Sequence, residues 1–213
     1  MNLKPLLTVL FGSSVVVANI TAAKVSGIPI PGLGIVGVPA GFIAFGVAFL
    51  MSDLLVEFYG EKYASEVVNS TVITLGVAYI LVWVAVALPP APFYDATAYN
   101  QVLGGSAAVV AASILTLALS QRFDVWLFAR VKEWTGEGQR YARNLISTGT
   151  SQVFDTVIFI TLAFTVFPYI QGGNPMWGLP LIMTIVGQYI AKVFVAVIDT
   201  PLFYIITTIR ARE

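Results

Sequence analysis

The stretch VVNSTVITLGVAYILVWVAVAL, residues 67–88, contains no Asp, Glu, Lys or Arg. A helix needs about 20 mainly apolar residues to cross the hydrocarbon core of a bilayer, and this stretch is long enough. Five further stretches are long and mainly apolar but contain a few charged residues, at residues 5–24, 37–58, 104–131, 144–167 and 179–209. The sequence therefore predicts an all-α, polytopic membrane protein, with a single transmembrane domain of six helices over residues 1–213.

The composition of the whole chain supports this fold class. Apolar residues make up 58% of the 213 residues and charged residues 10%, whereas an average soluble domain is about 25% charged. Acidic and basic residues number 11 each, so no net field attracts nucleic acid. The apolar start of the chain is longer than the usual signal-peptide core of about 7–15 residues, which favours a first membrane helix.

The chain contains neither Cys nor His. This excludes disulfides, thiol nucleophiles, zinc sites of the usual kind and a Ser-His-Asp triad. The phosphate-binding motif of P-loop enzymes, HExxH and GxSxG are also missing. Ser147, Ser151 and Lys192 offer the residue types of a Ser-Lys dyad, but nothing in their spacing supports one. We therefore predict that the protein is not an enzyme and that it binds no metal and no cofactor.

Lysine and arginine in the short loops predict the orientation in the membrane. One end of the predicted bundle carries nearly all of them: Lys4, Lys62, Arg130, Lys132, Arg140, Arg143, Arg210 and Arg212. The other end carries only Lys24. The bias predicts cytoplasmic N and C termini in a multi-pass protein of the cell (inner) membrane.

Between the helices, residues 26–41 are expected to form a tight connection or a re-entrant piece, and residues 59–66 a short charged connection.

Polar side chains inside the predicted spans are few. Such groups are costly in lipid, so they usually face the interior of a bundle or a wet cavity. They are Asn19, Lys24, Asp53, Glu57, Gln121, Arg122, Asp124, Gln152, Asp155, Gln188, Lys192 and Asp199. Their spacing of three, four or seven residues places many of them on shared helix faces.

One pattern of polar residues occurs twice. SQRFDVWLF (120–128) and SQVFDTVIF (151–159) each place a Gln and an Asp one helical turn apart, with a Phe one turn further on. Phe at such positions more often packs than stacks on a ligand. Gln and Asp can also simply join helices through hydrogen bonds, and Asp53 and Glu57 could only cap the end of a helix.

Depth singles out Asp155 and Lys192. At about 1.5 Å per residue, Asp155 lies about 18 Å from Arg143, and Lys192 lies about 20 Å from Leu179 at the opposite end. In a core about 30 Å thick, both side chains fall near the middle. We expect them to form a buried ion pair or to share a ligand, whereas Asp124 lies at a different depth.

The chemistry of these side chains fits a flat, nitrogen-rich ligand. A carboxylate accepts two hydrogen bonds side by side, and an amide both donates and accepts. Aromatic rings would supply a stacking face for a nucleobase. From the residues alone, an ion or an amino acid remains nearly as good a candidate.

Four segments in order resemble the queuosine precursor transporter family, also called the VUT or YhhQ family. They are SDLLVEFYGEKYA, LSQRFDVWLFARVKEWT, RNLISTGTSQVFDTVIFITLAF and GQYIAKVFVAVIDTPLFY, and VVANITAAK matches more weakly. The resemblance implies six transmembrane helices and uptake of a 7-deazapurine precursor of queuosine or archaeosine, of the preQ0, preQ1 or queuine type. It also implies a relation to the substrate-binding subunits (S components) of energy-coupling-factor (ECF) vitamin transporters.

The resemblance also assigns roles to residues. It implies substrate binding by Asn19, Gln121, Asp124, Gln152, Asp155, Gln188 and Lys192. Asp155 would accept ring N–H groups, and Lys192 would keep Asp155 ionised or meet the ring carbonyl. Gln152 and Gln188 would complete the edge. Asp53, Glu57 and Asp124 could either bind the substrate or form a gate.

Several functions compete at this stage. The first is a deazapurine carrier, and the alternative is an ECF-like binding subunit for a vitamin or nucleobase that needs a separate ATPase module. Ala18, Ala22 and Ala23 could dock such a module, or could be ordinary helix packing. An intramembrane enzyme, a scaffold without a ligand and a homodimeric assembly are further alternatives.

Overall fold

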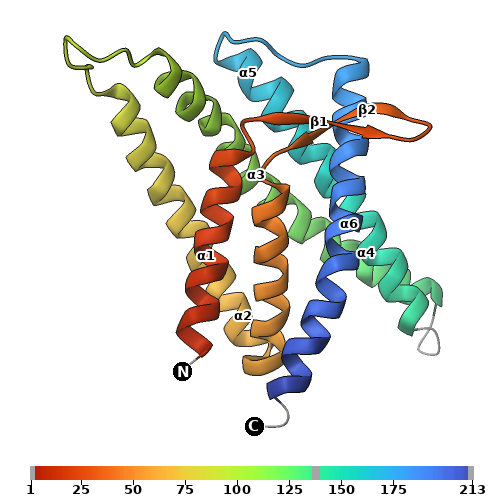
Figure 1. The fold of residues 1–213 in the computed structure, drawn as a ribbon. Helices are drawn as coiled ribbons and strands as arrows, with labels where there is room; N and C mark the ends of the chain where they lie inside the picture. The colour runs from red at the N-terminus through yellow and green to blue at the C-terminus, as the bar shows by residue number, and fades with distance from the viewer. Residues whose placement is uncertain (1–2, 136–139, 211–213) are drawn as a thin grey trace.

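The computed structural model describes the backbone of residues 3–135 and 140–210, and the side chains of most of these positions outside 117–151. The elements in chain order are α1 (Leu3–Thr21), β1 (Val25–Ile30), β2 (Gly34–Pro39), α2 (Phe42–Ala87), α3 (Thr97–Thr135), α4 (Arg140–Thr161), the π-helix η1 (Leu162–Val166), α5 (Phe167–Ile170) and α6 (Leu179–Arg210). Figure 1 shows long helices that run between two ends, with one small two-stranded sheet.

The all-α, polytopic membrane fold predicted from the sequence is confirmed. Five of the described helical segments are long and apolar enough to cross a membrane: Leu3–Thr21, Phe42–Gly60, Lys62–Ala87, Thr97–Thr116 and Gln152–Ile170. The sixth predicted span falls on α6, of which Leu179–Val195 is an apolar helical segment among the described residues. A total of six crossings stays a prediction.

The second and third predicted spans form one kinked element, α2. Residues 59–66 were expected to connect two helices, but they are helical except at Gly60, where φ is 82° and ψ is 162°. A positive φ of this size is costly for residues with a Cβ and is readily adopted by glycine. The chain changes direction at this kink. The first half of α2 runs towards the end that contains the kink, and the second half runs away from it (Figure 1).

A β-hairpin occupies most of the segment 26–41. The sequence predicted a tight connection there but not its strands, which pair antiparallel from Val25 opposite Pro39 to Ile30 opposite Gly34. Gly32 and Gly34 have φ of 83° and 79° at the turn, so glycine is what lets the chain reverse within so few residues.

The second strand of the hairpin lies directly against α6. Val36 and Val38 are buried there with Ala191. A Cβ on Gly187 would collide with the carbonyl oxygen of Gly37, so the two backbones can approach because Gly187 lacks a side chain; a Cβ on Gly37 would collide with the Thr184 side chain. This contact fixes the hairpin against the first part of α6.

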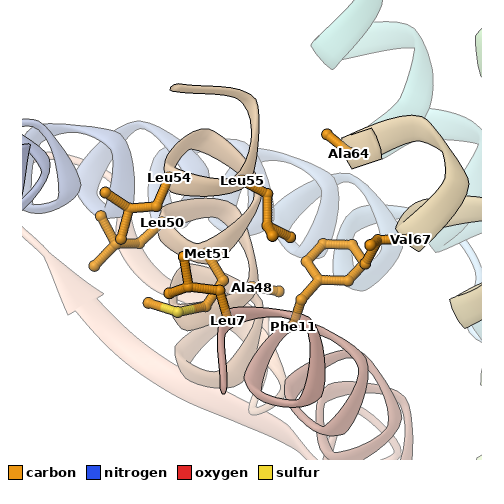
Figure 2. Packing of buried hydrophobic residues seen from close by; sticks show 9 residues of the cluster. All are labelled: Leu7, Phe11, Ala48, Leu50, Met51, Leu54, Leu55, Ala64 and Val67. Atoms are coloured by element: carbon orange, nitrogen blue, oxygen red, sulfur yellow. The ribbon is translucent and has the colours of Figure 1, made fainter. Parts of the chain in front are cut away.

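Close packing at the opposite end joins α1 to both halves of α2. Figure 2 shows the cluster, in which two side chains of α1 lie against the first half of α2 and reach the second half. Its members are Leu7, Phe11, Ala48, Leu50, Met51, Leu54, Leu55, Ala64 and Val67. Inside a bilayer, such contacts stabilise the bundle through van der Waals packing rather than through exclusion of water.

The segment between α5 and α6 folds back onto the π-helix. The Met176 amide donates to the Phe164 carbonyl over 2.7 Å, and the Thr165 hydroxyl donates to the Met176 carbonyl over 2.5 Å. A π-helix shifts the usual backbone hydrogen bonds and leaves a carbonyl available to other partners. The returning segment supplies that partner through the Met176 amide.

The two ends of the molecule differ in what they contain. The start of α1, the end of α6 and the kink of α2 lie at one end, and the hairpin lies towards the other (Figure 1).

At the start of α3, the Thr97 amide donates to Asp95 Oδ1 over 2.9 Å. Hydrogen bonds from the side chain and the backbone of Thr97 lower the pKa of the exposed Asp95 carboxyl.

Candidate functional site

A cavity of about 290 Å³ lies between the helices. Its described wall comes from α1, both halves of α2, α3, α4 and α6. Ligand sites in proteins typically measure about 300–1,000 Å³ and are lined mainly by apolar side chains with a few polar groups. The cavity therefore lies just below this range and suits a compact ligand.

Aromatic rings form a large part of the wall. Phe11, Phe42, Phe45, Phe49 and Phe159 line the cavity. The rings of Phe45 and Phe49 lie nearly parallel, with centroids 6.3 Å apart and an angle of 25° between their planes. These two residues are four positions apart on α2, so one helix face presents both rings. Such faces are suited to stacking against a flat ring system.

An ion pair lies in the same wall. Lys192 Nζ is 2.6 Å from Asp155 Oδ2, so the ion pair predicted from depth is confirmed. The side chains are 17% and 31% exposed, because both of them border the cavity. An ion pair hidden from water loses much of its solvation, and removal of one partner leaves the other charge uncompensated.

Lys192 also binds a third residue of the predicted set. Its Nζ donates to Gln152 Oε1 over 3.1 Å, in addition to the hydrogen bond to Asp155. Gln152 and Asp155 are three positions apart on α4, so they reach Lys192 from the same helix face. An ammonium group has three N–H donors, and these two partners use two of them. The third can serve an acceptor on a ligand.

Two further polar groups at the cavity wall have no partner within the described protein. They are the carboxamide oxygen of Gln188 and the hydroxyl of Thr116, on side chains only 4% and 3% exposed. The hydroxyl side chains of Ser52, Thr71 and Ser113 also line the cavity. The wall thus combines a charged pair, aromatic rings and neutral hydrogen-bonding groups.

Three of the remaining predicted residues are described by the structure, and none of the three is among the residues that line the cavity. Asn19 is fully buried in α1, where its Nδ2 donates to the Val15 carbonyl over 2.9 Å, and it is not among the described lining residues. Asp53 and Glu57 are exposed on α2 and do not border the cavity either. The side chains of Gln121 and Asp124 lie outside the described residues. Binding or gating roles for these five residues stay predictions.

Two of the three alanines of the proposed docking patch are buried, and Ala23 is only partly exposed. Ala18 is 0% and Ala22 1% exposed. A Cβ on Gly41 would collide with the Ala18 carbonyl, and Ala22 packs in a cluster with Phe159 and Ile160. The interpretation as ordinary helix packing is therefore correct for these two alanines.

The sequence did not single out several residues that line the cavity. Thr116, Ser113 and Thr71 are hydroxyl residues, which are common at helix contacts in membranes and so carry no separate signal. Phe45 and Phe49 follow the spacing of any packed helix face. The spacing of Ser113 and Thr116, three positions apart on a predicted span, is the one pattern that could have indicated a polar face there.

Comparison with known proteins places the chain among membrane transporters. Residues 39–206 match the protein family described as "Putative vitamin uptake transporter". A protein of Bacillus subtilis (strain 168) named "Probable queuosine precursor transporter" is 28% identical over 169 residues, which cover 77% of this chain and 69% of that protein. No solved structure matches the chain.

Proposed function

We propose that the chain, a member of the vitamin uptake transporter family with several helices long and apolar enough to cross a membrane, carries a queuosine precursor of the 7-deazapurine type. The relative from Bacillus subtilis is named for transport of a queuosine precursor. The chain resembles that relative over most of both sequences. The cavity between the helices is the proposed binding site.

One observation supports this proposal more than any other. The Lys192–Asp155 pair, 2.6 Å apart, borders a small cavity that is otherwise lined mainly by aromatic and aliphatic side chains. Charged groups inside a membrane bundle are costly and usually serve a ligand or an ion pathway. A compact heterocycle with a carbonyl group can use the remaining Lys192 donor and stack on the Phe rings.

The pair also changes the role expected for Asp155. The resemblance implied that this carboxylate accepts N–H groups of the ligand, but its Oδ2 already receives a hydrogen bond from Lys192. We propose that Asp155 chiefly holds the Lys192 ammonium in place. Gln152, one turn before Asp155 on α4, also holds Lys192 in place, because its Oε1 accepts a hydrogen bond from Nζ. Lys192 then presents a donor to the carbonyl of the ligand.

The alternative is a binding subunit that needs an ATPase module. Part of its support came from Ala18, Ala22 and Ala23 as a docking surface, and the first two of these are buried within the chain. We therefore propose a carrier that works without ATP of its own. Whether the protein forms a homodimer is tested by measuring the mass of the purified protein in detergent.

The test is a ligand panel on the purified protein. Thermal unfolding is followed with preQ0, preQ1, queuine, guanine and biotin, each over a range of concentrations. A ligand that binds the folded state at 100 times its Kd stabilises it by about 2.7 kcal/mol. We expect a rise in Tm with at least one 7-deazapurine and none with biotin.

Transport is then measured in proteoliposomes with the deazapurine that binds most tightly. Uptake by the protein without added ATP is expected. Stabilisation by biotin alone, or by no member of the panel, would contradict the proposed substrate class. Binding without uptake would instead favour a subunit that needs an energising partner.

A further inference from the structure

Thr116 on α3 and Gln188 on α6 share an unusual position. Both side chains are more than nine-tenths buried, both line the cavity, and the Thr116 hydroxyl and Gln188 Oε1 have no hydrogen-bond partner in the described protein. Threonine in a helix commonly donates its hydroxyl to a carbonyl one turn earlier, as Thr156 and Thr184 do here. Thr116 does not.

Buried polar groups are nearly always hydrogen-bonded, because an unpaired group loses its solvation without compensation. Two such groups on different helices that line one cavity therefore suggest partners supplied by a ligand. The Lys192–Asp155 pair differs, since its members satisfy each other within the protein. The cavity thus contains two kinds of polar site: a donor at Lys192, and unpaired oxygens at Gln188 and Thr116.

We propose that Gln188 and Thr116 are specificity-determining residues, whose oxygens each accept an N–H group of the ligand. The inference rests on the function proposed above and adds Thr116 to the binding residues. It implies a planar heterocycle that offers a carbonyl to Lys192 and N–H donors to the two oxygens. Guanine-like 7-deazapurines have such groups.

Three variants of the full-length protein test this inference. Thr116→Val and Gln188→Met remove the unpaired groups while they keep similar side-chain volumes. Thr184→Val is the matched control, because this equally buried threonine donates to Pro180 and is not among the lining residues. The Kd for 7-deazaguanine is measured for each variant, together with Tm in the absence of ligand.

Removal of an unpaired hydroxyl should not destabilise the protein. We therefore expect Thr116→Val to unfold at the same Tm as the wild type or a higher one, yet to bind 7-deazaguanine about tenfold more weakly. Gln188→Met should show a similar loss of affinity. Thr184→Val should bind normally. A purely structural role for Thr116 would instead lower Tm and leave Kd unchanged.

Analogues then identify the N–H groups concerned. 7-Deazahypoxanthine lacks the exocyclic amine, and 1-methyl- and 9-methyl-7-deazaguanine each block one ring N–H. We expect that the loss of affinity in each variant disappears for at least one analogue, since the partner of the removed group is then missing. The comparison is a double-mutant cycle in which one change is made in the protein and the other in the ligand, and it measures the interaction between the two altered groups.

Two results would overturn the inference while the proposed function stands. One is wild-type affinity for 7-deazaguanine in both variants, and the other is an equal loss across every analogue, which reports cavity shape rather than N–H recognition. If the wild-type protein binds no deazapurine at all, the proposed function fails and takes the inference with it.

Discussion

Asp155 lies on α4 and Lys192 on α6. Their similar predicted depth in the membrane allows the two side chains to meet. Their 2.6 Å contact lets each group offset the cost of the other charge, and Gln152 adds a third member. This arrangement explains how a largely apolar chain can keep an ammonium group in a cavity. It also makes the two charges strongly interdependent.

Single and double substitutions at this pair test that interdependence. Asp155→Asn and Lys192→Met each leave one charge without its partner, and we expect each to lower the free energy of unfolding by about 1–3 kcal/mol, less than for a fully buried pair. The combined variant should recover part of this loss, because no isolated charge remains. Chemical denaturation in detergent measures all three.

Ligand affinity separates the functional role from the structural one. In each variant we expect a strong loss of deazapurine binding, while the protein still inserts and folds. Normal affinity in Asp155→Asn would remove this carboxylate from the site. Strictly additive stability effects would show that the two charges do not interact.

At the scale of the elements, the contact between β2 and α6 controls how the hairpin sits on the bundle. Gly37 and Gly187 allow the two backbones to touch, and Gly187 lies next to Gln188 on α6. The position of the hairpin and the position of a cavity residue are therefore coupled through one tight backbone contact.

Gly187→Ala should disturb this contact, because its Cβ would collide with the Gly37 carbonyl. We expect a loss of about 1–3 kcal/mol of stability, as in other overpacked sites. Gly76→Ala in α2 is the matched control, since a Cβ there meets nothing within 4 Å. That change should be neutral or stabilising by up to about 1 kcal/mol, as alanine favours helices.

Thermal unfolding of the two alanine variants in the same detergent compares them directly. The clear result is a lower Tm for Gly187→Ala only. Equal Tm values for both variants would mean that β2 can move away from α6 without cost. The close approach of the β2 and α6 backbones would then contribute nothing to the free energy of unfolding.

At the scale of the whole molecule, the arrangement of the helices brings the start of α1, the kink of α2 and the end of α6 to one end (Figure 1). Most of the Lys and Arg residues named for the loops are predicted at this same end. Positively charged loops stay in the cytoplasm when membrane helices insert. We therefore expect this end to face the cytoplasm.

The chain contains no Cys, so single cysteines can report the orientation without other changes. Asp95→Cys and Lys62→Cys place a thiol at exposed positions, one in the connection before α3 and one just after the kink of α2. A membrane-impermeant maleimide should label Asp95→Cys on intact cells, and Lys62→Cys only after the membrane is permeabilised.

Detergent-solubilised protein is the control, in which both thiols should react. Labelling of Lys62→Cys on intact cells, with Asp95→Cys protected, would invert the predicted topology. Equal labelling of both sites would contradict a single orientation. The cytoplasmic placement of the termini depends on this outcome.

Much of the fold could be predicted because its signals are local. The apolar runs marked five described spans, and a constant rise per residue placed Asp155 and Lys192 at matching depth. The hairpin was missed because its strands are short and rich in Gly and Pro, which resembles an ordinary loop. The helical character of residues 59–66 was hidden by their charges.

The sequence by itself determined the membrane-spanning fold and the similar depth of Asp155 and Lys192, since both follow from hydrophobicity and helix geometry along one chain. Only the tertiary structure decided which neutral residues face the cavity. Thr116 and Thr156 look alike in sequence, but one is unpaired at the cavity wall and the other bonds its own helix. The physical reason is that a hydroxyl gains its role from its neighbours in space, and those neighbours come from other helices.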